Sequence, residues 1–272
     1  MNHIQIDIRA TGELQEVLIA LLADVGYAGF EQQDARLLAF MPETQFDETG
    51  LTALLQSYGI DFSIGRIGEK NWNEEWEKNY RPVVIEGFCA VRAHFHDPIG
   101  GVPYELVITP KMSFGTGHHA TTFMMLEAMR SLPLQGKRVL DFGTGTGVLA
   151  ILAERLGAGK ILAIDHDDWS IANAQENAET NGCTRITIEK SDTVAGLPGP
   201  FDFILANINK YVILSELSGM VQQLARGGVI LLSGLMRDDL EDIENEAARN
   251  KLSISVRMAK DSWIALKTEE MK

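Results

Sequence analysis

Val139-Leu140-Asp141-Phe142-Gly143-Thr144-Gly145-Thr146-Gly147-Val148-Leu149-Ala150 is the stretch that decides the fold. An apolar run, a glycine-rich turn and an amphipathic run follow one another, which predicts a buried strand, a tight turn and a helix. Glycines let a ligand approach the backbone closely, and the first N–H groups of a helix lack partners within it. The pattern indicates a nucleotide-type site; a tight turn that binds nothing is the alternative.

The chain on either side alternates between strand-like and helix-like patterns. Strands are predicted at 138–143, 161–165, 186–191, 201–206 and 228–234, and helices at 147–157, 168–181, 209–225 and 238–249. This alternation predicts an α/β fold with a parallel, doubly wound sheet. The runs 251–258 and 261–268 predict an antiparallel hairpin that closes the sheet, and 83–95 and 105–110 predict further strands before it.

Residues 1–66 predict a separate small domain. Strands at 3–9, 27–32, 35–41 and 60–67 and helices at 12–25 and 48–58 give the order β-α-β-β-α-β, which is a ferredoxin-like α+β unit. Residues 67–82 then predict a linker helix, and 83–272 form the second domain. Trp72 and Trp76 share a face of that helix. Packing against a domain is the main interpretation of the two rings, and ligand contact is the alternative.

Composition excludes several classes of protein. The 272 residues are 45% hydrophobic and 23% charged, an ordinary globular composition. No apolar run is long enough for a membrane span, and the first residues lack the pattern of a signal peptide, so we expect a cytoplasmic protein. Cys89 and Cys183 lie far apart, which predicts neither a disulfide nor a zinc site. His94 and His96 share a predicted strand face, but no further ligands follow at suitable spacing, and no metal centre is expected.

The net charge of −14 is concentrated in the first domain. Residues 1–66 contain ten acidic and three basic side chains, a balance of −7. Such a surface does not suit nucleic acid, whose phosphates need Lys and Arg. We therefore expect a basic protein partner there, and an acidic face that only maintains solubility is the alternative.

Two acids suggest which ligand the turn binds. Asp165 ends the predicted strand 161–165, where a carboxylate can accept hydrogen bonds from both hydroxyls of an adenosine ribose. It could instead belong to a helix-capping cluster, in which Asp167 or Asp168 is the expected cap. Asp141 precedes glycines spaced Gly-x-Gly-x-Gly rather than Gly-x-Gly-x-x-Gly, and an acid there would repel a pyrophosphate. The turn therefore favours S-adenosylmethionine, with its cationic amino-acid end, over NAD.

Asn207 follows the predicted strand 201–206. In a doubly wound sheet this strand flanks the point where the order reverses, so Asn207 should lie across the crevice from Gly143. A polar side chain at the end of a buried strand is a candidate for catalysis. Capping of the next helix is the alternative and is compatible with it.

A further motif, Met112-Ser113-Phe114-Gly115-Thr116-Gly117-His118-His119-Ala120-Thr121-Thr122, completes a recognisable set. Together with the Trp72 and Trp76 linker, the 141–147 turn, Asp165 and the Asn207-Ile208 pair, it resembles the ribosomal protein L11 methyltransferase family. The resemblance covers roughly residues 70–272. It implies a class I methyltransferase: a seven-stranded doubly wound sheet with a small N-terminal ferredoxin-like α+β domain.

The resemblance also implies an activity and a set of residues. Members transfer methyl groups from S-adenosylmethionine to lysine side chains and the N-terminal amine of a large-subunit ribosomal protein. The N-terminal domain docks that substrate, and the linker lets the domains reorient. The cofactor-binding residues would be Thr122, Asp141, Gly143, Gly145, Asp165 and Asn207, with Asn207 also catalytic.

Two positions depart from the family pattern. Ala120 stands where proline is usual, which is expected to loosen the loop, and Thr144 stands where cysteine is usual, which is expected to matter little. His118 or His119 is an open candidate for removing a proton. Three other functions remain as alternatives: an NAD-dependent oxidoreductase, a methyltransferase for another acceptor, and a binding module without activity.

Overall fold

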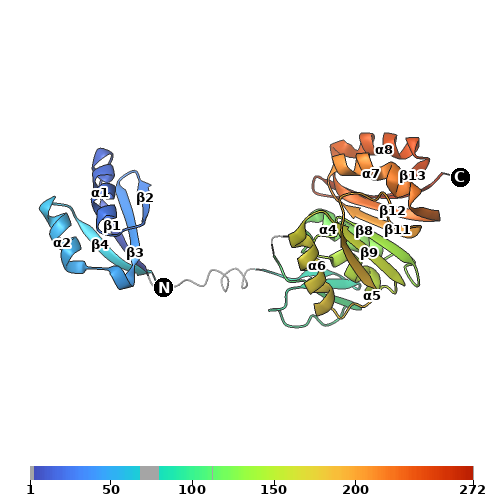
Figure 1. The fold of residues 1–272 in the computed structure, drawn as a ribbon, viewed down its shortest axis with the longest axis horizontal. Helices are drawn as coiled ribbons and strands as arrows, with labels where there is room; N and C mark the ends of the chain where they lie inside the picture. Colours follow the sequence, from blue (N-terminus) through green and yellow to red (C-terminus); the bar gives the residue numbers. More distant parts are fainter. Residues whose placement is uncertain (1–2, 68–79, 112, 272) are drawn as a thin grey trace. The chain divides into compact units, whose positions relative to one another are not determined.

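The computed structural model describes residues 3–67, 80–111 and 113–271. The chain divides into two compact units, Met1–Tyr80 and Arg81–Lys272, each with hydrophobic core of its own (Figure 1). Most of the linker helix predicted at 67–82, including Trp72 and Trp76, falls outside the described residues. The predicted domain limits therefore stay predictions.

The N-terminal unit combines a four-stranded antiparallel sheet with two helices. Its elements are β1 His3–Arg9, α1 Glu13–Asp24, β2 Gly29–Gln33, β3 Arg36–Pro42, the 3-10 turn η1 Glu43–Gln45, α2 Glu48–Ser57 and β4 Phe62–Ile67. The strands lie in the order β2-β3-β1-β4. Ile4, Ile6 and Ile8 of β1 are buried with residues of both helices, because alternate residues of a strand face the same side.

The second unit begins with a small sheet. Its strands β5 Val83–Ile85, β6 Cys89–Arg92 and β7 Tyr104–Val107 lie in that order, the first pair antiparallel and the second parallel. A helix that the sequence did not predict, α4 Ala120–Met129, follows. Seven of its ten residues are buried, so it lacks the polar face by which a surface helix is recognised.

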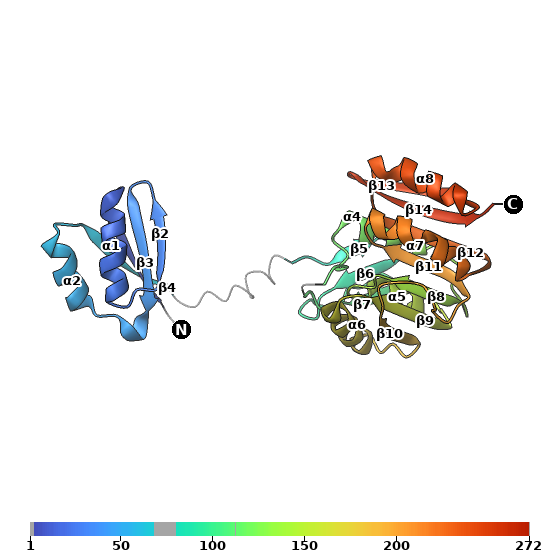
Figure 2. The same cartoon turned by 45° about the horizontal axis from the view of Figure 1, so that its top comes forward.

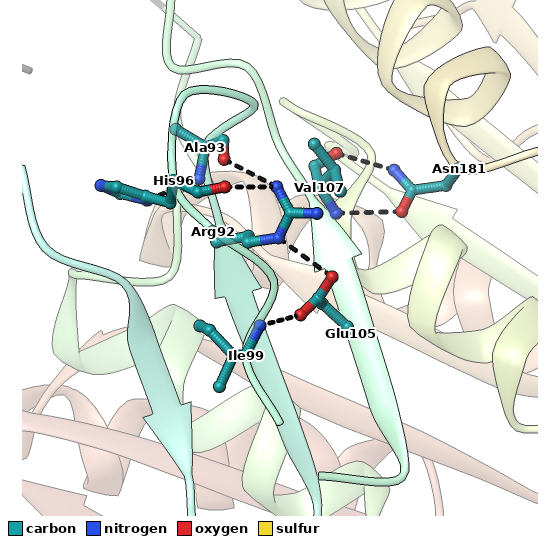
Figure 3. A network of polar contacts seen from close by, with 7 residues as sticks. All are labelled: Arg92, Ala93, His96, Ile99, Glu105, Val107 and Asn181. Carbon is teal, nitrogen blue, oxygen red and sulfur yellow. Dashed lines mark hydrogen bonds and ion pairs between the residues drawn. The ribbon is translucent and has the colours of Figure 1, made fainter. Parts of the chain in front are cut away.

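The strand predicted at 83–95 ends before its histidines. Arg92 donates from Nε to Glu105 at 3.0 Å and from Nη1 to the carbonyl groups of Ala93 and His96 at 3.2 and 3.0 Å (Figure 3). These bonds stabilise a turn after Arg92, so the prediction that His94 and His96 share a strand face is wrong. Among the described residues, no three side chains of the metal-binding types come together.

The large sheet has seven strands in the order β10-β9-β8-β11-β12-β14-β13. They are β8 Arg138–Phe142, β9 Lys160–Asp165, β10 Ile186–Lys190, β11 Phe201–Asn207, β12 Leu224–Met236, β13 Leu252–Lys260 and β14 Trp263–Glu270. Neighbours from β10 to β12 are parallel, and β14 pairs antiparallel with both β12 and β13. The predicted doubly wound sheet with a closing hairpin is confirmed.

Helices cover both faces of this sheet. They are α5 Val148–Arg155, α6 Asp168–Thr180, α7 Lys210–Gln222 and α8 Leu240–Arg249, the last preceded by the 3-10 turn η2 Arg237–Asp239. Figures 1 and 2 show α7 and α8 on one side of the sheet and α5 and α6 on the other. Val139 faces a core with α4 and α5, whereas its neighbour Leu140 faces a core with α7 and α8. Burial on both faces explains the continuous apolar runs in the sequence.

The carboxyl ends of three parallel strands, β9, β8 and β11, lie side by side at the same end of the sheet. Phe142 at the end of β8 pairs with Ile164 of β9 on one side and with Ala206 of β11 on the other. Asp165 and Asn207, one residue further along, therefore flank the glycine turn that leaves β8. Ligands of open α/β sheets bind at the carboxyl ends of the strands, at the point where the strand order reverses.

Candidate active site

The glycine turn at 143–147 connects β8 to α5. Gly143, Gly145 and Gly147 have φ angles of 75°, 54° and 82°, which side chains other than glycine rarely adopt. A Cβ at Gly143 would lie 2.2 Å from Cγ2 of Ile208, and a Cβ at Gly145 would lie 2.2 Å from the carbonyl oxygen of Phe114. Both the backbone conformation and two closely packed segments thus require glycine here.

Every backbone N–H group of this turn already donates within the protein. Those of residues 143, 144, 146 and 147 donate to backbone carbonyl groups at 2.8 to 2.9 Å. The Gly145 N–H donates to Oδ2 of Asp165 at 2.9 Å. Glycine turns that seat a pyrophosphate do so with N–H groups aimed at the ligand. This turn offers none of its five, which disfavours a dinucleotide.

Asp141 lies beneath the turn and is fully buried. Its Oδ2 accepts the Thr144 hydroxyl at 2.7 Å and the Ala150 N–H at 3.2 Å, so it connects the turn to the start of α5. No described residue donates to its Oδ1. Burial raises the pKa of Asp141 to about 7, although the bonds from Thr144 and Ala150 lower it. The side chain supports the turn from within the core.

The Thr144 side chain has a definite partner. Its hydroxyl donates to Asp141. The cysteine that is usual in the family at this position would offer only a weak S–H donor, so threonine makes the stronger hydrogen bond. Ala120, the other departure, is the first residue of α4, where alanine and proline are both compatible with the helix.

Asp165 is nearly buried, with 7% of its surface exposed. Besides the Gly145 N–H on Oδ2, its Oδ1 accepts the Asp167 N–H at 3.1 Å. Asp167 in turn caps α6 by accepting from the Ser170 N–H at 2.9 Å, as expected for this cluster. His166 Nδ1 also lies 3.3 Å from Oδ1. Two backbone N–H groups thus fix the Asp165 carboxylate, and Oδ2 has a further lone pair for a hydroxyl ligand.

Thr122 and Asn207 meet on the other side of the turn. Asn207 Nδ2 donates to Oγ1 of Thr122 at 3.2 Å, which brings α4 against the end of β11. Asn207 Oδ1 is buried and accepts no hydrogen bond from the residues that the structure describes. Asn209, not Asn207, caps α7 through the Val212 N–H, so the capping alternative for Asn207 is wrong. This amide oxygen at the end of a strand is thus an acceptor for which a ligand can supply the donor.

The segment 113–119, which we call the Phe114 loop, crosses the glycine turn. Thr146 donates from its N–H to the carbonyl of Phe114 at 2.9 Å and from its hydroxyl to that of Gly115 at 2.7 Å. Asn177 of α6 joins the same region, since it donates to the Thr146 carbonyl at 2.8 Å and accepts the Thr109 N–H at 2.9 Å. The loop is therefore held over the turn at two adjacent positions.

One helical turn further along α6, Asn181 makes a similar connection. It both accepts from the N–H and donates to the carbonyl of Val107, at 3.0 and 2.7 Å, as a neighbouring strand would (Figure 3). The side chain amide thus anchors β7 to α6. This contact sets the position from which the chain enters the Phe114 loop.

A cavity of about 250 Å³ opens beside the Asn207 side chain. Its lining residues are Phe114, His119, Thr121, Asn207, Ile208, Asn209, Gly234 and Trp263. The rings of His119 and Trp263 lie 4.7 Å apart and those of Phe114 and His119 5.1 Å apart, both edge to face. Sequence reasoning missed Trp263, because only the pairing of β14 with β12 brings it to this edge.

The two loop histidines have structural partners. His118 Nε2 lies 2.7 Å from the Arg81 carbonyl oxygen, and Nδ1 lies 3.2 Å from the Thr116 hydroxyl. His119 Nδ1 accepts the Thr121 N–H at 3.3 Å and caps α4. In the neutral ring this leaves the proton on Nε2 and no free lone pair, which disfavours His119 as a base.

The arrangement fits S-adenosylmethionine. A fixed carboxylate, Asp165, is available for ribose hydroxyls, and an unpaired amide oxygen, on Asn207, is available for an ammonium group. The glycine turn permits close approach without spare N–H groups for phosphates.

In the described parts of the chain, no helix has the length and apolar character needed to cross a membrane.

Comparison with known proteins agrees with this geometry. The family model "Ribosomal protein L11 methyltransferase (PrmA)" matches residues 27–271. The chain belongs to this family. Relatives named ribosomal protein L11 methyltransferase include one from Porphyromonas gingivalis, 40% identical over 259 residues (93% of this chain, 89% of the relative), and one from Chlorobaculum parvum, 36% identical over 276 residues (97% and 95%).

Solved structures give the same result. The crystal structure titled ribosomal protein L11 methylase from Lactobacillus delbrueckii subsp. bulgaricus has a TM-score of 0.67 at 30% identity, covering 71% of this chain and 100% of that one. As a member of this family, the protein is a class I methyltransferase whose cofactor is S-adenosylmethionine. An NAD-dependent oxidoreductase is not favoured.

Proposed function

We propose that this protein transfers methyl groups from S-adenosylmethionine to amino groups of ribosomal protein L11, on lysine side chains and the N-terminal amine. The names of its relatives supply the acceptor protein. The observation that carries the chemistry is Asn207, which lines a cavity and whose buried side-chain oxygen has no hydrogen-bond partner among the described residues. Such an acceptor suits a nitrogen that bears protons.

The residues around the glycine turn would hold the cofactor. Asp165 would accept from the ribose hydroxyls, and Gly143 and Gly145 would let the ligand lie against the backbone. Thr122 would contact it from α4. Asp141, fully buried, would act mainly by keeping the turn in shape. The bound cofactor supplies an electrophilic methyl group on a sulfonium.

Asn207 would orient the acceptor amine. The amine must be neutral to attack, which at pH 7 costs about 4.6 kcal/mol for a lysine and about 1 kcal/mol for an α-amine. The amide oxygen of Asn207 is no base, but it can accept an N–H and aim the lone pair, so that orientation supplies much of the rate. Methylation of the N-terminal amine should therefore be the easier reaction.

Mass spectrometry of unmethylated ribosomal protein L11 after incubation with enzyme and cofactor tests this function. We expect mass increases of whole methyl groups, located by peptide mapping on lysine or the N-terminal residue. Asn207→Ala should lower the rate about tenfold to a hundredfold, the value of a hydrogen bond to a charged group. Asn209→Ala, which alters the cap of α7 in the same cavity, is the matched control. No mass increase would refute the proposal.

The N-terminal unit would dock the basic substrate by its acidic surface, in the cytoplasm where ribosomal proteins are made. Asp24 and Glu31 are exposed there, and the described unit has Arg9, Arg36 and Arg66 as its cationic Lys or Arg side chains. Electrostatic docking of this kind weakens with salt.

A double charge reversal tests the docking role. Asp24→Lys/Glu31→Lys should raise KM for ribosomal protein L11 by about tenfold at low salt, with kcat and cofactor affinity unchanged. The matched control is Glu179→Lys/Glu270→Lys, at two exposed acids of the second unit, near the end of α6 and at the end of β14. An equal effect of both reversals would mean that only net charge matters and would contradict docking by the N-terminal unit.

A further inference from the structure

The cavity beside Asn207 has two chemically different walls. One is the Asn207 side chain amide, which can accept N–H groups. The other is made of three rings in contact, Phe114, His119 and Trp263, with centroid separations of 5.1 and 4.7 Å. They come from the Phe114 loop and from the first residue of β14, so their meeting is a property of the fold.

Methylation changes how an amine uses these two walls. In each transfer the nitrogen lone pair forms the new N–C bond while the S–C bond of the sulfonium breaks, and the product amine carries a positive charge. It must lose a proton to solvent before it can accept again. A primary ammonium has three N–H groups for an amide oxygen, and each methyl group removes one. Attraction of a cation to an aromatic face needs no N–H, and quaternary ammonium groups are bound in this way.

We propose that Phe114, His119 and Trp263 form an aromatic wall that binds the acceptor nitrogen in its methylated, cationic states, and that this wall determines how many methyl groups one amine receives. The inference rests on the proposed function and adds a determinant of product to it. Trp263 is the main member, since tryptophan gives the strongest cation–π attraction. Phe114, with 52% of its surface exposed, borders the solvent side.

His119 and Phe114 also make hydrogen bonds that stabilise the fold, so Trp263 is the best position at which to test the wall. His119 caps α4 through Thr121, and the Phe114 carbonyl accepts from Thr146 of the glycine turn. Trp263 pairs through its backbone with Met236 and Lys260, contacts that a substitution of its side chain leaves in place.

The first experiment measures binding by the full-length protein without cofactor. Ligand-observed NMR compares choline, a quaternary ammonium, with 3,3-dimethylbutan-1-ol, its neutral isostere. We expect choline to bind about tenfold more tightly, within the range of cation–π energies. Trp263→Leu should reduce this preference to less than about twofold, whereas Trp263→Phe, which keeps a ring, should retain part of it. Trp169→Leu, at a tryptophan with 80% of its surface exposed and outside the cavity, is the matched control.

The second experiment measures product. Intact mass spectrometry follows ribosomal protein L11, unmethylated or reductively dimethylated beforehand, with each variant. Trp263→Leu should lower transfer to dimethylated amines by at least about tenfold more than it lowers the first transfer, as expected from the loss of a cation–π contact that methylated, cationic acceptors make. Unchanged choline preference and unchanged products in Trp263→Leu would overturn the aromatic wall. No transfer by the wild-type enzyme to either acceptor would instead refute the proposed function, which the choline comparison does not require.

Discussion

Asp141→Asn should remove a pH dependence from the stability of the catalytic unit. Burial raises the pKa of the folded carboxyl from 3.8 to about 7, so the folded protein binds this proton more tightly than the unfolded chain does. The contribution of Asp141 to stability is therefore greatest in acid, declines as pH rises from about 4 to about 7, and is absent above that range. Between about pH 5 and about pH 8 the wild type should lose about 2.5 kcal/mol, at 1.36 kcal/mol for each unit of pKa.

The asparagine variant keeps an oxygen for the Thr144 hydroxyl and the Ala150 N–H, but it cannot ionise. Its new amide N–H groups would lie unpaired at the position of Oδ1, which lowers stability by about 1 to 3 kcal/mol at every pH. The variant should thus be less stable than the wild type in acid and approach or exceed it in alkali. The difference between the two proteins, rather than either value alone, isolates this carboxyl.

Urea unfolding followed by tryptophan fluorescence measures the difference. Trp72 and Trp76 are replaced by phenylalanine in every protein compared, so that the signal comes from Trp169 and Trp263 of the catalytic unit. Asp202→Asn is the control. Burial raises the pKa of Asp202, but hydrogen bonds from the Arg138 N–H and the Lys137 ammonium group, together with the positive charges of both side chains, lower it overall, so the carboxyl is ionised in both states above about pH 5. A difference between wild type and Asp141→Asn that stays constant from about pH 5 to about pH 8 would refute the reasoning.

Two further variants test the cofactor site by calorimetric titration with S-adenosylmethionine. Asp165→Asn should weaken binding by about 1 to 3 kcal/mol through loss of charged hydrogen bonds, whereas Asp168→Asn, on an exposed ion pair, should not. Equal affinity of both variants would exclude Asp165 from the ribose site. Gly143→Ala should destabilise the fold and abolish measurable binding, because its Cβ would overlap Ile208. Gly136→Ala, also at positive φ but with open space around it, should cost only about 1 kcal/mol of stability, and a similar loss at Gly143 would contradict the close packing.

The large sheet was predictable because the patterns that indicate its strands lie within short stretches of sequence. Strands such as Val139–Phe142 and Ile161–Asp165 are buried on both faces, so each is a continuous apolar run followed by a turn signal. The glycine turn and the acid at the next strand end are also short-range patterns. Their meeting at one edge follows from the general rule for parallel strands.

Other features of the fold and of the site could not be predicted, because they depend on contacts between residues far apart in the sequence. Helix α4 is buried nearly all round, so it lacks the alternation by which a surface helix is recognised. Trp263 reaches the cavity only through the register of β14 on β12, and Asp141 is directed inward by hydrogen bonds to Thr144 and Ala150. The turn at Arg92, which separates His94 and His96 from the strand, depends on a carboxylate of β7.

Phe114 belongs to two sites at once. Its carbonyl oxygen accepts from Thr146 on the glycine turn, while its ring contacts His119 at the mouth of the cavity. A ligand that displaces this residue on either side must therefore alter the other side, and linkage requires the two affinities to change by the same factor. The proposed cofactor site and the proposed acceptor cavity thus share one residue, and a ligand that shifts Phe114 at one of them would change the affinity of the other.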